Sequence, residues 1–263
     1  MDCKPLIIFF ILASIACNSK TPEKLLITDS ATNNTKTLSA SLNYNAVNEI
    51  PLPGGYTRKK YEPQSFSAWL QHVSVKKDKT VYLYDGRKKN NQLAQYAVLD
   101  ISVGNKDLQQ CADAVMRLRS EYLFDKKKYD SIEFFDNAGT AYKFSKPYER
   151  NNFNNYLNRV FGMCGSASLA KQLNTKSDFA AIEAGDVIIR GGFPGHAVIV
   201  MDVAVNGEGK KLYLLAQSYM PAQDIHVLIN PSNDDLSPWY EVNDDEKVVT
   251  PEYVFTKNEL KTW

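Results

Sequence analysis

The chain has 263 residues, enough for one large domain or two small ones. Hydrophobic residues make up 44% of it, which suits a globular core, and the formal net charge of +1 gives no reason to expect nucleic acid as a partner. There is no phosphate-binding glycine loop and no repeat of solenoid length, so nucleotide-binding and solenoid proteins are not indicated either.

The N-terminus has the pattern of a lipoprotein signal peptide, residues 1–16. Lys4 precedes an apolar run that is too short to span a bilayer. Ser14-Ile15-Ala16-Cys17 resembles, in a loose form, the motif read by lipoprotein signal peptidase. Cleavage there would leave a lipidated Cys17 that anchors the protein in a membrane. In lipoproteins, an Asp directly after the lipidated cysteine indicates the inner membrane. Residue 18 is Asn, so the pattern implies the outer membrane of the cell envelope. Ordinary secretion and an uncleaved anchor are the alternatives.

Composition divides the remaining chain into two parts. Residues 17–47 are rich in Ser, Thr, Asn and Lys and are predicted to form a flexible tether. Residues 48–263 are predicted to form a single domain, which the chain enters through the proline- and glycine-rich segment 50–56. Its residues before about 150 belong to the same domain as those after.

Hydrophobic periodicity predicts the elements in chain order. Helices are expected over residues 65–73, 108–123, 151–162 and 166–173, the second of them capped by Asp107. Strands are expected over residues 81–84, 96–103, 131–135, 141–144, 187–189, 197–201, 212–219 and 225–229, with a docking strand or turn in the tail, 248–263. The fold class is therefore α+β, with an antiparallel sheet or partial barrel packed against two or more helices.

A glycine-rich turn between two β-branched runs ends in His196. The neighbours Gly192 and Gly195 leave room for a backbone or a ligand to approach the start of the next strand. A histidine there can serve as a base, a proton shuttle or a metal ligand. The alternative is a loop histidine bonded to a nearby carbonyl. His226 is expected on an exposed strand face.

Two cysteines, Cys111 and Cys164, lie within the predicted domain. In an oxidising envelope they could pair, or they could be free thiols that are buried or catalytic. Cys111 falls in the first turns of a helix but on its apolar stripe, which favours a buried small hydrophobe. Cys164 comes just before the helix that starts at Ser166. No Cys-x-x-Cys or His-x-x-x-His spacing exists, so neither a metal site nor a cofactor is expected.

The chain resembles a cysteine peptidase of the NlpC/P60 type, a superfamily similar to a smaller papain. The resemblance lies in a helix with a cysteine, a strand that begins with Gly-His and a polar residue on the following strand. The resemblance implies a thiol nucleophile at Cys111 or Cys164, with His196 as base. Gln217 would orient the imidazole through its amide oxygen. The chain departs from that superfamily in lacking an Asp-Cys signature, and Cys164 lies closer to His196 along the chain than the superfamily pattern requires.

Four blocks of the chain, spread over residues 48–240, are similar to an uncharacterised bacterial cell-envelope lipoprotein family, a domain of unknown function. They are residues 107–119, 191–200, 214–226 and 237–240. The resemblance implies an envelope location and brings no established activity. It also implies a cysteine at the position of Cys111 and often a small residue at that of Cys164. It therefore favours Cys111 as the nucleophile, whereas the helical periodicity alone favours Cys164.

Two functions follow as hypotheses. The first is a membrane-anchored thiol amidase or peptidase acting on an envelope peptide or amide. The second is a non-catalytic module on the same fold that binds a peptide, a glycan or a partner lipoprotein. The predicted binding residues are Gly192, Phe193, Gly195, Tyr219 and Trp239. A disulfide-stapled structural lipoprotein is a third alternative.

Overall fold

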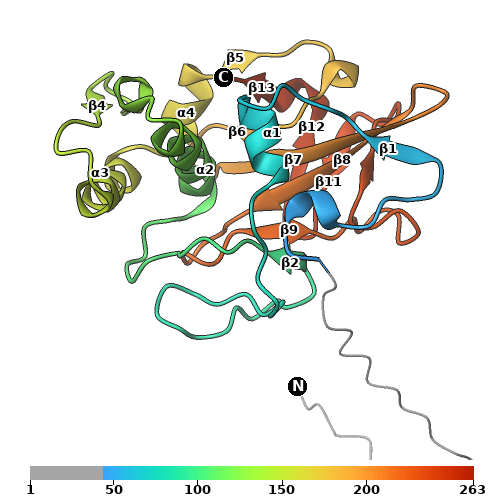
Figure 1. The fold of residues 1–263 in the computed structure, drawn as a ribbon, viewed down its shortest axis with the longest axis horizontal. Coiled ribbons are helices and arrows are strands. Elements are labelled where there is room, and N and C mark those ends of the chain that lie inside the picture. The colour runs from blue at the N-terminus through green and yellow to red at the C-terminus, as the bar shows by residue number, and fades with distance from the viewer. Residues whose placement is uncertain (1–43) are drawn as a thin grey trace, which may run out of the picture. The chain divides into compact units, whose positions relative to one another are not determined.

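The structure is a computed structural model that describes residues 44–263 (Figure 1). The predicted signal peptide, the lipidation site Cys17 and the tether up to residue 43 lie outside the described residues. Within the described part of the chain, no helix has the length and apolar character needed to cross a membrane.

Within residues 44–263, the structure has four α-helices and thirteen strands. The helices are α1 (Phe66–Gln71), α2 (Cys111–Asp125), α3 (Arg150–Met163) and α4 (Ser166–Gln172). The strands are β1 (Tyr56–Arg58), β2 (Gln95–Val98), β3 (Glu133–Phe135), β4 (Ala141–Lys143), β5 (Asn174–Thr175), β6 (Val187–Arg190), β7 (His196–Asn206), β8 (Lys211–Gln217), β9 (His226–Leu228), β10 (Tyr240–Glu241), β11 (Lys247–Val249), β12 (Val254–Thr256) and β13 (Leu260–Thr262). Short 3-10 helices lie at Val47–Glu49, Tyr129–Ser131, Phe179–Ala181 and Lys257–Glu259.

The main sheet has nine strands, and all of its pairs are antiparallel. Its order is β2-β9-β8-β7-β6-β13-β5, with β1 added to β7 and β10 added to β8. Within the described residues the first and last strands of this order do not pair, so the sheet is open. The prediction of an α+β fold with an antiparallel sheet is therefore confirmed. The alternative of a partial barrel is not. The hairpins β3–β4 and β11–β12 stand apart from this sheet.

Strand β7 separates two hydrophobic cores. Ala197, Ile199 and Met201 face the core shared with the helices, while Val198 and Val200 face a second core that includes the β11–β12 hairpin. Burial on both faces explains why residues 197–201 of β7 are an uninterrupted apolar run rather than an alternating one. Figure 1 shows α2, α3 and α4 gathered beside one end of the sheet.

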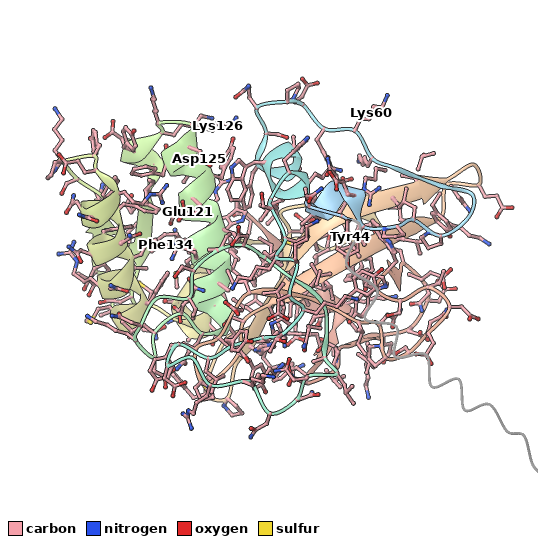
Figure 2. The ribbon with its side chains drawn as sticks, turned by 60° about the horizontal axis from the view of Figure 1, so that its bottom comes forward. Tyr44, Lys60, Glu121, Asp125, Lys126 and Phe134 are labelled. Atoms are coloured by element: carbon pink, nitrogen blue, oxygen red, sulfur yellow. The ribbon has the colours of Figure 1, made fainter. Side chains whose placement is uncertain are left out.

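The predicted elements recur with shifted bounds. The segment 81–84 makes only isolated bridges instead of a strand, and β2 is shorter than the predicted strand over residues 96–103. The core also begins earlier than residue 48, because Val47 is fully buried and the ring of Tyr44 stacks on that of Tyr96. Figure 2 shows Tyr44 among the side chains of the folded body.

A buried carboxylate fastens the N-terminal segment to β7. Asp202, fully buried, accepts hydrogen bonds from Arg58 Nε at 2.8 Å and from Gln71 Nε2 at 2.7 Å. Arg58 also donates to the Ile50 carbonyl. Burial raises the pKa of Asp202, and the bonds from Gln71 and Arg58 oppose that rise. One carboxylate therefore joins β1, α1 and β7.

We expect Arg58→Ala to lower the free energy of unfolding by about 3 kcal/mol, because it leaves the buried Asp202 without its cation. Urea denaturation followed by circular dichroism measures the change. Lys60→Ala is the matched control. Its side chain extends from the surface (Figure 2), so the expected change is below about 0.5 kcal/mol. Equal losses in the two variants would contradict the role of the Arg58–Asp202 pair.

Candidate active site

Helix α2 begins at Cys111, three residues later than the predicted start at residue 108. Asp107 does not cap the helix, because its carboxylate accepts hydrogen bonds from the Ala222 amide at 2.7 Å and from Gln110 Nε2 at 3.1 Å. The cap is Gln110, whose backbone N–H donates to Asp113 Oδ2 at 3.0 Å. Cys111 is therefore the first helical residue, and its backbone N–H has no partner within the helix.

The Cys111 sulfur lies against the start of β7. The Ala197 backbone N–H interacts with it and lowers its pKa, as do the amides of Ala112 and of Cys111 itself. Burial outweighs these contributions, and together with the charge of Asp113 it raises the pKa of the thiol from 9.0 to about 11. Ala197 lies beyond the last β7–β8 pair, Ile199 with Ala216, and pairs on its other side with Ile189 of β6. Cys111 thus meets the chain directly beside His196.

His196 is the first residue of β7, as predicted, and its side chain is 2% exposed. Its Nε2 lies 2.8 Å from Gln217 Oε1, and because an amide oxygen only accepts, Nε2 carries the proton and Nδ1 is the basic nitrogen. The rings of Tyr219 and Tyr253 lie 4.8 and 4.9 Å from the imidazole, and Phe255 stacks on it. Burial in this setting lowers the pKa of His196 to about 4, while the Gln217 bond opposes the shift.

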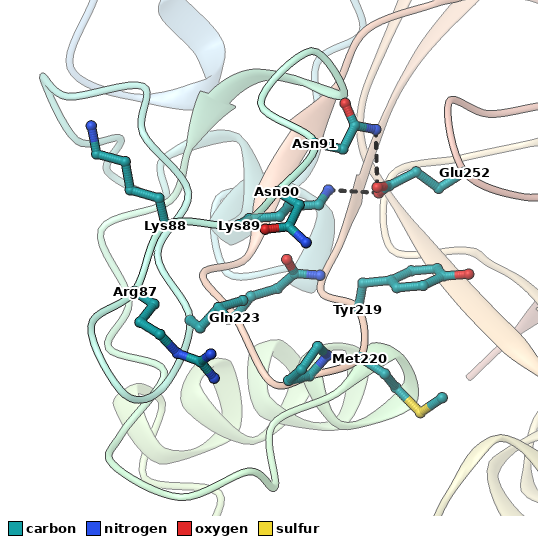
Figure 3. Close-up of a pocket in the computed structure, with 11 residues that line it drawn as sticks. Arg87, Lys88, Lys89, Asn90, Asn91, Tyr219, Met220, Gln223 and Glu252 are labelled. Atoms are coloured by element: carbon teal, nitrogen blue, oxygen red, sulfur yellow. Dashed lines mark hydrogen bonds and ion pairs between the residues drawn. The ribbon is translucent and has the colours of Figure 1, made fainter.

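A chain of polar contacts holds the Gln217 amide in one orientation. Gln217 Nε2 donates to Glu252 Oε2 at 2.8 Å, which leaves Oε1 directed at His196. Lys89 Nζ lies 2.6 Å from the same Glu252 oxygen, and Asn91 Nδ2 donates to the other oxygen at 3.1 Å (Figure 3). Glu252, whose charge is neutralised by Lys89, therefore orients the Gln217 amide, and Gln217 in turn orients the His196 imidazole.

The glycine-rich turn approaches the start of α4. Ser166 Oγ donates to the Gly192 carbonyl at 3.3 Å, and a β-carbon on Gly195 would lie only 2.3 Å from the same hydroxyl. Glycine is needed at position 195 for this close approach. Phe193 projects from the turn with 91% of its surface exposed. Gly192, Phe193 and Gly195 thus lead directly into His196, while Tyr219 touches its ring.

Two predicted site residues lie elsewhere. Trp239 is 1% exposed, and its indole N–H donates to the Pro51 carbonyl at 2.7 Å, so it belongs to the core and cannot line a groove. Cys164 is buried at the end of α3, where burial raises the pKa of its thiol to about 11 and the nearby charges are Asp136 and Asp113. The charges that act on it, Asp136 and Asp113, are not those that act on His196, which are Glu252 and Lys89. The choice of Cys111 or Cys164 as nucleophile stays a prediction.

The structure also describes the state of the two cysteines and of His226. Cys111 and Cys164 are both free thiols rather than a disulfide. Among residues 44–263, no cluster of metal-ligating side chains occurs. The expectation of an exposed His226 is wrong: the side chain is fully buried, its Nδ1 contacts the Asp224 carbonyl at 2.9 Å, and burial lowers its pKa to about 3.

Sequence reasoning missed the residues that support the histidine from distant segments. Lys89 and Asn91 come from a long loop, and Glu252 and Tyr253 come from the tail that was predicted only as a docking element. The one signal in the sequence is Pro251-Glu252-Tyr253, a charged residue between a proline and an aromatic residue, which is too common to mark a site.

These features define an α+β protein in which a thiol at a helix N-terminus lies against the backbone of Ala197, the residue that follows a histidine hydrogen-bonded to a glutamine. The chain matches the family model described as Domain of unknown function (4846) over residues 47–148 and 136–262, and it belongs to that family. Comparison with curated proteins and with solved structures found no match.

We expect alkylation of Cys111 by iodoacetamide to accelerate about tenfold per pH unit from pH 6 to pH 9, because only the thiolate reacts. With a thiol pKa of about 11 and a His196 pKa of about 4, both groups are uncharged between these values. Mass spectrometry of the Cys111 peptide measures the rate. A plateau reached below pH 7 would instead show a resting thiolate–imidazolium pair and contradict this assignment.

Proposed function

We propose that the protein is a thiol-dependent amidase or peptidase, with Cys111 as nucleophile, His196 as general base and Gln217 as the residue that positions the imidazole. The observation that carries the proposal is the placement of the Cys111 sulfur against the Ala197 amide, directly beside a histidine whose tautomer is set by Gln217. A resemblance to NlpC/P60 peptidases in the order helix cysteine, strand histidine and polar residue supports it.

The reaction runs in two stages. Cys111 Sγ bonds to the carbonyl carbon of the amide while His196 Nδ1 takes the thiol proton. The oxygen that gains negative charge is stabilised by the backbone N–H groups at the start of α2 and by the positive end of that helix. When the C–N bond breaks, the imidazolium gives its proton to the leaving amine. Water then hydrolyses the thioester, with His196 as base again, and restores the thiol.

A non-catalytic binding module is the second candidate. The observations that favour it are the low exposure of His196 and the uncharged state of its pair with Cys111 at neutral pH. Such a module would hold an envelope peptide or glycan against the glycine-rich turn and Tyr219. It predicts ligand binding without turnover.

Replacement of Cys111 by Ala is expected to reduce hydrolysis of an N-acetyl-peptidyl aminocoumarin library to the background rate, because the thioester can no longer form. Cys164→Ala is the matched control and should keep full activity, since that thiol is buried at the end of α3 near the charges of Asp136 and Asp113. Release of aminocoumarin is the readout, and circular dichroism verifies the fold of each variant.

His196→Ala should be as inactive as Cys111→Ala, because the two groups act as a unit. Hydrolysis that survives in Cys111→Ala or His196→Ala would reject the mechanism. A wild-type chain that binds library peptides without cleaving any of them would favour the binding module.

We further propose that Cys17 is lipidated and anchors the protein in the outer membrane of the cell envelope. The support is the apolar run that ends in Ser14-Ile15-Ala16-Cys17 and the Asn at position 18. In cells fed an alkyne fatty acid, the wild-type chain should carry the label and fractionate with outer membranes, and Cys17→Ser should lose the label. Label retained in Cys17→Ser would contradict the assignment of the anchor.

A further inference from the structure

Two tyrosines flank the His196 imidazole, and their hydroxyls have different surroundings. The ring centroids of Tyr219 and Tyr253 lie 4.8 and 4.9 Å from that of His196. Tyr253 also faces Arg190, whose guanidinium carbon lies 5.4 Å from the centroid of the Tyr253 ring and shares a hydrogen bond with that side chain. The Tyr219 hydroxyl has no hydrogen-bond partner within residues 44–263. Of the two hydroxyls, that of Tyr219 is therefore the one available to a ligand.

Tyr219 also lies within electrostatic reach of the Cys111 thiol. Burial, followed by the charges of Glu252, Cys111 and Tyr253, raises the pKa of Tyr219 above its usual value of 10.0. The phenol therefore keeps its proton throughout the neutral range and remains a hydrogen-bond donor. One side chain thus contacts the candidate base and brings an unpartnered donor toward the candidate nucleophile.

A cavity of about 370 Å³ gives a ligand access to Tyr219. Tyr219 and Met220 line one side of it, and residues 87–91 line another. Figure 3 shows the Tyr219 side chain extending away from Arg87 and Lys88, so neither cation lies beside its hydroxyl. The ring is partly exposed, whereas His196 is 2% exposed. A substrate that enters from this cavity would therefore contact Tyr219 before it reaches the imidazole.

We propose that Tyr219 is a further catalytic residue, whose hydroxyl donates a hydrogen bond to the substrate carbonyl oxygen as that oxygen becomes negatively charged. The inference rests on the proposed amidase function. When Cys111 Sγ bonds to the carbonyl carbon, the electron pair of the C=O π bond moves to the oxygen. The Tyr219 O–H and the N–H groups at the start of α2 then share that charge, and the phenol keeps its proton. When the C–N bond breaks, the pair returns to re-form the C=O bond.

The test uses a library of N-acetyl-dipeptide aldehydes and the corresponding alcohols on the full chain. A thiol adds reversibly to an aldehyde, and the oxygen of the resulting thiohemiacetal imitates the charged oxygen of the reaction, whereas the alcohols form no adduct. Protection of Cys111 from iodoacetamide, followed by mass spectrometry, gives a Kd for each compound. Tyr219→Phe should reduce the preference for aldehyde over alcohol about tenfold, because it removes the donor and keeps the ring. Tyr253→Phe is the matched control and should retain the wild-type preference.

Turnover of the aminocoumarin substrates provides a second readout. In Tyr219→Phe, kcat should fall about 100-fold while KM stays unchanged, because the hydroxyl acts on the transition state and not on the bound substrate. An unchanged aldehyde preference in Tyr219→Phe, or an equal loss of affinity for aldehydes and alcohols, would overturn the role of Tyr219 and leave the amidase hypothesis intact. A wild-type chain with no preference for aldehydes would instead reject Cys111 as nucleophile, and the role of Tyr219 with it.

Discussion

The position of Cys111 depends on hydrogen bonds between two loops that are far apart in the sequence. The Ser218 hydroxyl lies 2.9 Å from the Gln109 carbonyl, and Asp107 accepts from the Ala222 amide at 2.7 Å. These contacts hold residues 107–110 in a non-helical course along the end of β8. A helix that started at residue 108 would place Cys111 within its first full turn instead of at its first position. The contacts between the loops therefore make Cys111 the first residue of α2, where its backbone N–H has no partner within the helix.

The histidine depends in turn on groups that no single segment supplies. The register that pairs Ile199 with Ala216 places Gln217 diagonally across from His196 on the same face of the sheet. Gln217 could present either its oxygen or its nitrogen, and Glu252 decides this by accepting from the nitrogen. Burying that carboxylate would be costly without Lys89, which neutralises it. The tautomer of His196 is thus set by a relay of three further side chains.

The sequence was sufficient for the parts of this site that depend on local pattern. β-branched runs around a glycine-rich turn placed His196 at a strand start, and the resemblance to NlpC/P60 peptidases pointed to Gln217 on the next strand. The start of α2 could not be predicted, because the Asp107 carboxylate bonds to Ala222, over a hundred residues away, instead of capping the helix. Trp239 was predicted as a binding residue from its place between a proline and a tyrosine. The local sequence does not reveal that its indole N–H donates to the Pro51 carbonyl. Glu252 depends entirely on tertiary contacts.

Burial acts on the thiol and the imidazole in opposite directions and leaves both uncharged at neutral pH. In the proposed reaction the proton therefore has to move from the thiol to the imidazole during attack on the carbonyl, whereas a preformed ion pair would react as a ready thiolate. The same low-polarity surroundings would strengthen the interaction between the N–H groups at the start of α2 and the oxygen that becomes charged. The proposed mechanism thus stabilises charge as it develops rather than at rest. The rings of Tyr219, Tyr253 and Phe255 contact the buried His196 ring and give it these surroundings.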